Sequence, residues 1–264
     1  MTLPVVALFL VLAFVAEVIG TMAGFGAATI LTPVASLFMD IKTAVALVAF
    51  FHLFGNSSRW YFFRPHVQWR LVLQFGIAGV AASFLGAQVA SWLSPASIRV
   101  VLGIFLILFA VLEFTGVFSM RVPARLETLL IGGILSGFVA GLIGTGGAIR
   151  SVSLLAFGLP KEAYIGTSAV IALLVDATRL PVYLARGFLP LRWLPLLVVL
   201  TAVAFCGSWL GQRLIRQVSP VRFRRFVLLM LCLMGIKLLA DGVRDSRRVV
   251  AGTLRSMSLA SARP

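Results

Sequence analysis

Acidic residues are scarce in this 264-residue chain, which has only 8 Asp and Glu against 23 Lys and Arg. The formal net charge is therefore +15 at pH 7. In a soluble protein this balance would suggest a nucleic-acid partner, but here the basic residues mostly separate long apolar segments. Anionic lipid head groups and membrane topology explain that placement more simply. We therefore expect membrane lipids, and no nucleic acid, as partners.

Cysteine and histidine are too rare to indicate a metal or redox centre. Cys206 and Cys232 lie inside apolar segments without a CxxC motif, which is typical of small buried hydrophobic residues. His52 has no second histidine at ligand spacing, so we interpret it as a core residue, and His66 lies in a loop. The sequence also lacks a Walker loop, an HExxH motif and a Ser/His/Asp set, one of which a membrane enzyme would need. We expect no metal, no cofactor and no enzymatic activity.

Hydrophobic residues, in contrast, make up 61% of the chain, and the mean hydropathy is +1.08. Ten apolar segments follow one another: 3–20, 27–39, 43–63, 71–93, 97–118, 127–143, 147–159, 164–184, 191–211 and 222–240. Eight of these ten have, or nearly have, the length of about 20 residues that spans a bilayer. The segments 27–39 and 147–159 are too short and are predicted to be half-helices. We expect an all-α, polytopic transmembrane helical bundle. No basic region precedes the first segment, so we expect it to be a permanent helix rather than a cleaved signal peptide.

Two glycine-rich breaks, 120 residues apart, indicate an internal duplication. The first contains Gly24-Phe25-Gly26 and the second Gly144-Thr145-Gly146-Gly147, and a half-length segment follows each. The same offset aligns the polar quartet NSSR at 56–59 with DATR at 176–179. We predict two homologous repeats, 1–120 and 121–241, each with a broken helix, followed by a basic, disordered tail at 242–264.

The relative orientation of the two repeats depends on how many times each half crosses the membrane. Five crossings per half is an odd number and would make the halves inverted with respect to each other. If the long and short segments around each break together make one crossing, the halves are parallel instead. We favour inversion, which is common among transporters.

The glycine breaks are the best candidates for a binding site. A broken helix inside a membrane leaves backbone groups free, which is tolerated only where protein or a water-filled cavity receives them. Free N–H groups at the start of a half-helix favour an anion. The residues predicted at this site are Gly24, Gly26, Gly144, Thr145, Gly146 and Gly147. Close helix packing through small residues is the alternative interpretation.

Polar residues inside the apolar segments extend the predicted site. Asn56 and Arg59, like Asp176 and Arg179, are three residues apart and share a helix face. A charge at a helix centre costs about 2.5–3.5 kcal/mol on insertion scales, so such residues tend to face a cavity or a partner. Alternatively, Arg59 extends to the lipid head groups beside the aromatic run that follows it, and Asp176 forms only a local ion pair with Arg179.

Hydroxyl and carboxyl groups supply the remaining candidates. Thr167 and Ser168 could donate hydrogen bonds to an oxyanion, although small hydroxyl residues also simply bridge helices. Glu17, just before the first break, and Asp176 are the candidates for proton coupling. Glu113 is as well explained as a carboxylate at a helix end.

Several of these motifs resemble the TauE/SafE family of bacterial membrane permeases, the sulfite and organosulfonate exporter group. The resemblance covers roughly residues 8–240 and rests on both glycine breaks, Pro33, Leu85-Gly86 with Ser94-Pro95, and Leu210-Gly211 with Ser219-Pro220. It implies two homologous halves and the movement of small sulfur-containing anions, or related carboxylates, across the inner membrane. The chain departs from the family pattern in the Gly-Phe-Gly-Ala form of the first break and in Ser153, which occupies the position equivalent to Pro33.

Together with the resemblance, the sequence predicts a secondary transporter (permease) for a small anionic substrate, which we expect to be sulfite, an organosulfonate or a related carboxylate. Movement of one repeat against the other would expose the site alternately to the two sides of the membrane. A homodimer is a further expected assembly. The alternative is a non-transporting membrane scaffold or accessory subunit whose polar residues serve packing alone.

Overall fold

The computed structural model describes residues 2–23, 26–116, 122–214 and 220–261. All of the regular structure in these ranges is helical, which confirms the predicted all-α class. The elements are α1 (Leu3–Ala23), α2 (Ala28–Ala35), α3 (Ile41–Phe63), η1 (Arg64–His66), α4 (Trp69–Trp92), α5 (Pro95–Phe114), α6 (Leu126–Ile143), α7 (Gly147–Leu155), α8 (Lys161–Ala185), η3 (Leu191–Trp193), α9 (Leu194–Leu214) and α10 (Pro220–Ser261).

Six helices in the described ranges are long and apolar enough to cross a membrane: α1, α4, α5, α6, α8 and α9. Helix α3 also has the length, with 23 residues, but its polar side chains lower its hydropathy. Large apolar side chains cover the outside of the bundle, including Ile77, Trp92 and Val198, each more than 70% exposed. Such a surface is suited to lipid rather than water. The chain is a multi-pass membrane protein.

Each glycine break reverses the direction of the chain. Gly26 has φ +86° and Gly144 has φ +84°, a left-handed conformation that side chains other than glycine rarely adopt. After the first break the chain returns along α1, because the rings of Phe9 and Phe38 lie 5.4 Å apart. After the second break it returns along α6, where the Ser136 hydroxyl donates to the Gly146 carbonyl at 2.8 Å. The half-length helices α2 and α7 are therefore the second arms of two helical hairpins.

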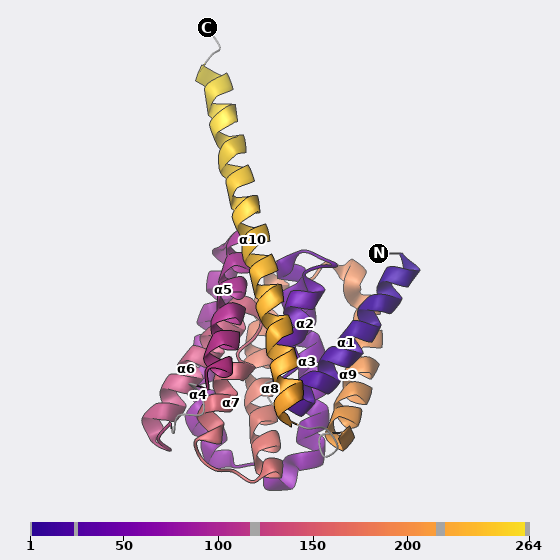
Figure 1. Ribbon diagram of the computed structural model, residues 1–264, viewed down its shortest axis with the longest axis vertical. Helices are drawn as coiled ribbons and strands as arrows, with labels where there is room; N and C mark the ends of the chain where they lie inside the picture. Colours follow the sequence, from indigo (N-terminus) through magenta and orange to yellow (C-terminus); the bar gives the residue numbers. More distant parts are fainter. Residues whose placement is uncertain (1, 24–25, 117–121, 215–219, 262–264) are drawn as a thin grey trace.

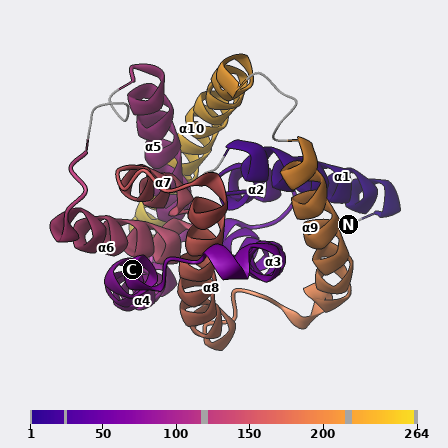
Figure 2. The ribbon, with the colours of Figure 1, turned by 90° about the horizontal axis from the view of Figure 1, so that it is seen from below.

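The long helices pack in pairs around a central pair, α3 and α8. Figure 2 shows α3 and α8 between the α4–α6 pair on one side and the α1–α9 pair on the other, with α5 and α10 forming a further pair. Glycine allows the closest approaches: a Cβ added to Gly137 of α6 would lie 2.1 Å from the Gly79 carbonyl oxygen of α4. Close approach of backbones through small residues is the usual way in which helices associate in lipid.

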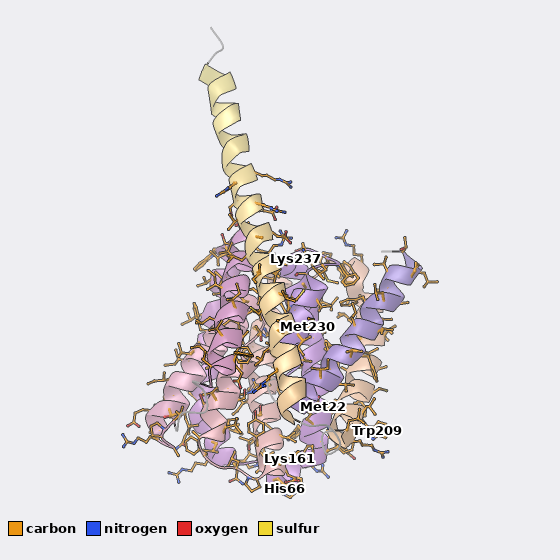
Figure 3. All side chains as sticks on the ribbon, in the orientation of Figure 1. Met22, His66, Lys161, Trp209, Met230 and Lys237 are labelled. Carbon is orange, nitrogen blue, oxygen red and sulfur yellow. The ribbon has the colours of Figure 1, made fainter. Side chains whose placement is uncertain are left out.

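The directions of the helices follow from residues at the two ends of the bundle. His66, after α3, and Lys161, at the start of α8, lie at the same end, so α3 and α8 run in opposite directions (Figure 3). Lys237 of α10 lies toward the other end. Both termini are on that side, and α10 projects well beyond the bundle (Figure 1).

The two predicted repeats contain the same order of long and short helices. Position 120/121 falls between α5 and α6, and each side of it holds a long helix, a short helix and three further long helices. The segment beyond residue 241, for which we expected a disordered tail, instead continues α10 as helix to Ser261.

Candidate functional site

The two chain breaks meet inside the bundle. The hydroxyl oxygens of Thr29, at the start of α2, and Thr145, just before α7, lie 2.7 Å apart, and both side chains are buried. A Cβ added to Gly144 would lie 3.3 Å from the Thr32 hydroxyl oxygen, again joining the second break to α2. The breaks therefore face each other across the interior and not the lipid.

Both short helices begin at this meeting point. Neither α2 nor α7 has a side-chain hydrogen bond that caps its N-terminus. The first N–H groups of a helix have no partner within the helix, and the helix dipole is positive at that end. Two positive helix ends thus lie in the interior of the protein, within one region.

Arg59 of α3 is held inside the bundle by groups on two helices. It forms an ion pair with Glu17 of α1, donates to the Thr21 hydroxyl at 2.7 Å and donates to the Asn56 side-chain oxygen at 2.8 Å. All four side chains are buried. Arg59 therefore does not extend to the head groups, which was one of the two interpretations of its sequence context.

Arg179 of α8 makes an equivalent set of contacts in the second half. Its Nε and Nη2 atoms donate to the same carboxylate oxygen of Asp176 at 2.9 and 2.6 Å. Its Nη1 atom donates to the Ala140 carbonyl of α6 at 2.6 Å. Each of the two arginines thus contacts the helix that precedes the break in its own half, α1 for Arg59 and α6 for Arg179. The ion pair with Asp176 is local, as one interpretation held, and is also fully interior.

His52 joins these two clusters into one network. Its Nδ1 atom lies 2.8 Å from the second carboxylate oxygen of Asp176, across the α3–α8 contact. Asn56, one turn further along α3, donates to the His52 carbonyl at 2.9 Å. The interpretation of His52 as a core residue missed this link. The available signal was the spacing of His52, Asn56 and Arg59, four and then three residues apart, which places all three on one helix face.

A small cavity lies beside this network, with a volume of about 30 Å³. That volume is on the scale of single water molecules. Its polar lining consists of Thr21, Asn56, Arg59, Arg150, Tyr164 and Ser168, and the glycine of the first break, Gly26, completes one wall. The walls come from both halves of the chain, so relative movement of α1 and α3 against α7 and α8 would change the size of the cavity.

Arg150 of α7 is a site residue that sequence reasoning missed. It is only 5% exposed, it lines the cavity, and its Nε atom donates to the Ser168 hydroxyl at 2.9 Å. No ion pair joins it to a carboxylate among the described residues. The signal in the sequence was a single arginine three residues into the short segment after the second break.

The buried charges do not balance. Within the described part of the chain, the buried ionised side chains are those of Glu17, Arg59, Arg150, Asp176 and Arg179. Two carboxylates therefore face three guanidinium groups, and Arg150 is the guanidinium without an acidic partner. With His52 neutral, one positive charge remains uncompensated at the cavity.

Most of the predicted site residues lie in this region. Gly26, Asn56, Arg59 and Ser168 line the cavity, while Asp176, Arg179 and Glu17 form the ion pairs beside it. Around the second break lie Gly144, Thr145, Gly146 and Gly147, the last being the first residue of α7. Gly146 also packs closely, since an added Cβ would lie 2.1 Å from the Ser136 carbonyl oxygen. Gly24 lies outside the described residues.

Thr167 is placed away from the cavity. Its hydroxyl accepts a hydrogen bond from the Gln68 backbone N–H at 2.9 Å, just before α4 begins at Trp69. Its neighbour Ser168 faces Arg150 instead. Adjacent residues on an α-helix point about 100° apart, so Thr167 faces the start of α4 while Ser168 faces Arg150.

A polytopic bundle with two interior chain breaks and buried ionisable groups at their meeting point has the construction of a membrane transporter. The sequence model of the family described as "Sulfite exporter TauE/SafE" matches residues 9–238. The chain belongs to this family and is a membrane transporter. It is also similar to a probable membrane transporter protein of Methanocaldococcus jannaschii, with 24% identity over 256 residues, covering 88% of this chain and 94% of that protein. The resemblance stated from the sequence motifs is confirmed.

Proposed function

We propose that this protein is a secondary transporter of a small anion, such as sulfite, an organosulfonate or a related carboxylate, in the bacterial inner membrane. The observation that carries the proposal is the uncompensated charge of Arg150 at the cavity between the two breaks. Burying an unpaired charge is unfavourable by several kcal/mol or more. A bound anion would supply the missing negative charge.

The chemistry of the cavity favours an oxyanion. A guanidinium group offers planar, paired N–H donors that match two oxygens of a carboxylate or sulfonate. Arg59 and Arg150 approach the cavity from α3 and α7, one from each half of the chain, and Ser168 adds a hydroxyl group. An anion held between them would bridge the two halves directly.

We further propose that the halves are inverted repeats that move against each other during transport. The helices of the two halves correspond in order, α1 to α6, α2 to α7 and so on to α5 and α10. Replacing each helix by its counterpart turns the packed pair α1–α9 into the packed pair α6–α4. The same replacement turns the pairs α3–α8 and α5–α10 into themselves. If the halves are inverted, two helices that are each other's counterparts must run in opposite directions. The counterparts α3 and α8 do run in opposite directions (Figure 3). Since the cavity holds only about 30 Å³, an anion must enter through a more open arrangement of the halves, as in alternating access.

The competing proposal is a membrane scaffold or accessory subunit. Close glycine contacts, such as that between Gly137 and Gly79, serve packing in either case. The unbalanced Arg150 charge discriminates, because a packing role gives no reason to bury a guanidinium group without a carboxylate. Uncompensated charges inside a membrane domain are more typical of a substrate or ion pathway.

The experiment is flux into liposomes that contain the purified protein. Sulfite, methanesulfonate and acetate are offered under pH gradients of both signs, and the wild type is compared with Arg150→Gln. The matched control is Arg70→Gln, which removes one positive charge from an exposed position of α4. We expect wild type and Arg70→Gln to move at least one of these anions and Arg150→Gln to lose most of that flux. Absence of flux of all three anions in the wild type would contradict the proposal.

A further inference from the structure

The protonation of His52 follows from its partners. Asp176 uses one carboxylate oxygen to accept two bonds from Arg179 and presents the other to His52 Nδ1 at 2.8 Å. An ionised carboxylate can only accept, so Nδ1 carries the hydrogen. The Asn56 amide nitrogen, 3.0 Å from the same atom, donates to the His52 carbonyl. In neutral imidazole the other ring nitrogen, Nε2, then has no hydrogen and is a base.

This basic nitrogen is buried and has no hydrogen-bond partner in the described part of the chain. His52 is 4% exposed. Its Nε2 atom points at the first break, where a Cβ added to Gly26 would lie 3.0 Å from it, and Gly26 itself lines the cavity. Buried polar atoms without a partner are rare in folded proteins, and each needs an explanation.

The buried charged groups near His52, within the described part of the chain, come from four helices. Asp176 and Arg179 face it from α8, and Arg59 lies on its own helix. Glu17 of α1 is paired with Arg59, and Arg150 of α7 lines the adjacent cavity. These groups sum to one positive charge while His52 is neutral and to two when Nε2 is protonated. A monovalent anion would neutralise the net charge of +1, and a divalent anion would neutralise the net charge of +2.

We propose that His52, which lies behind Gly26 beside the cavity, binds a proton during transport. A proton on Nε2 accompanies a divalent oxyanion but is not needed with a monovalent one. This inference rests on the proposed anion transport and adds to it a proton site and a rule for anion valence. A proton from the entry side adds to the Nε2 lone pair as the anion enters. The same N–H bond breaks on the exit side as both leave. One net negative charge then crosses per cycle for either valence.

The two carboxylates are less suited to this role. Glu17 and Asp176, which the sequence indicated for proton coupling, already form ion pairs with Arg59 and Arg179. Protonating either of them would leave its arginine buried without a counter-charge, which is strongly unfavourable. Protonating His52 instead produces an imidazolium group whose N–H at Nδ1 already contacts the Asp176 carboxylate.

The first experiment reads the protonation of His52 directly. The chain has two histidines, so His66→Gln leaves His52 as the single histidine, and ¹⁵N-histidine labelling gives signals from that ring alone. Spectra are recorded near neutral pH without anion, with sulfate and with methanesulfonate, whose valences are fixed there. We expect the neutral Nδ1–H form without anion and with methanesulfonate, and imidazolium with sulfate. A neutral ring in sulfate, or an Nε2–H form without anion, would overturn the proposal.

The second experiment counts protons during flux into liposomes. Wild type and the His66→Gln control should take up about one proton per sulfate and none per methanesulfonate. In His52→Gln the sulfate-to-methanesulfonate flux ratio should fall at least about tenfold, with no proton uptake. Equal proton counts for both anions, an unchanged ratio in His52→Gln, or transport of methanesulfonate without sulfate would each overturn the inference while leaving anion transport in place. The proposed function itself is contradicted by a different result, the absence of wild-type flux of sulfite, methanesulfonate and acetate.

Discussion

The hydroxyl oxygens of Thr29 and Thr145 are 2.7 Å apart and share a hydrogen bond, although the two residues are 116 positions apart in the chain. This contact joins the start of α2 to the residue before α7, and so joins the two half-length helices that follow the two breaks. Both side chains are buried, and each hydroxyl is the other's partner. The site between the breaks is therefore built by both halves of the chain together.

This pair allows a double-mutant test of the contact. Thr29→Val or Thr145→Val alone should each lower the free energy of unfolding by about 1–3 kcal/mol, because the remaining hydroxyl stays buried without a partner. The double variant should be closer to wild type than the sum of the two losses. Unfolding measured in detergent checks this. Simple additivity of the two losses would show that the hydroxyl groups do not interact.

Gly26 should be intolerant of a side chain for two separate reasons. Its φ of +86° costs a non-glycine residue about 1–2 kcal/mol, and an added Cβ would also lie 3.0 Å from His52 Nε2. Gly158→Ala is the matched control, because Gly158 has φ +60° but no atom within 4 Å of an added Cβ. We expect both variants to lose stability and only Gly26→Ala to lose anion flux as well. Equal flux in the two would contradict a role for the break in transport.

The Glu17–Arg59 pair should be far more sensitive than an ion pair at the edge of the bundle. Glu17→Gln leaves a buried guanidinium group uncompensated, which should cost about 3–5 kcal/mol. Asp245→Asn breaks the Arg99–Asp245 pair, whose side chains are 22% and 38% exposed, and should cost no more than about 1 kcal/mol. Comparing the two variants by unfolding in detergent tests this difference. Similar costs would mean that Glu17 is less isolated from solvent than the structure indicates.

Neighbouring residues on α8 should have different roles. Thr167→Ala removes the acceptor for the Gln68 N–H and should lower stability by about 1 kcal/mol without changing anion affinity. Ser168→Ala removes the partner of Arg150 Nε at the cavity and should change anion affinity. Affinity is measured from the concentration dependence of flux in liposomes. A larger change in affinity for Thr167→Ala than for Ser168→Ala would contradict the assignment.

The sequence by itself determined the helical class, the positions of the segments and the two breaks. Lipid offers no hydrogen bonds, so a membrane chain must be helical wherever it is apolar, and a glycine-rich interruption stands out against that background. The motifs around Gly26 and Gly144 also identified the family. Six of the eight segments with spanning length correspond to helices in the described ranges that are also apolar enough to cross a membrane. The segment at 43–63 corresponds to α3, whose polar side chains lower its hydropathy.

Only the tertiary structure decided which polar residues meet. Arg150 is one arginine in a short segment, and its missing counter-charge becomes visible only once every buried carboxylate has been placed. His52 gains its role from Asp176, 124 residues away on another helix. Thr167 and Ser168 are adjacent in sequence, yet Ser168 lines the cavity while Thr167 packs against the start of α4, because their side chains point about 100° apart. Local composition fixes where helices form, whereas the contacts of a site depend on which faces of distant helices pack together.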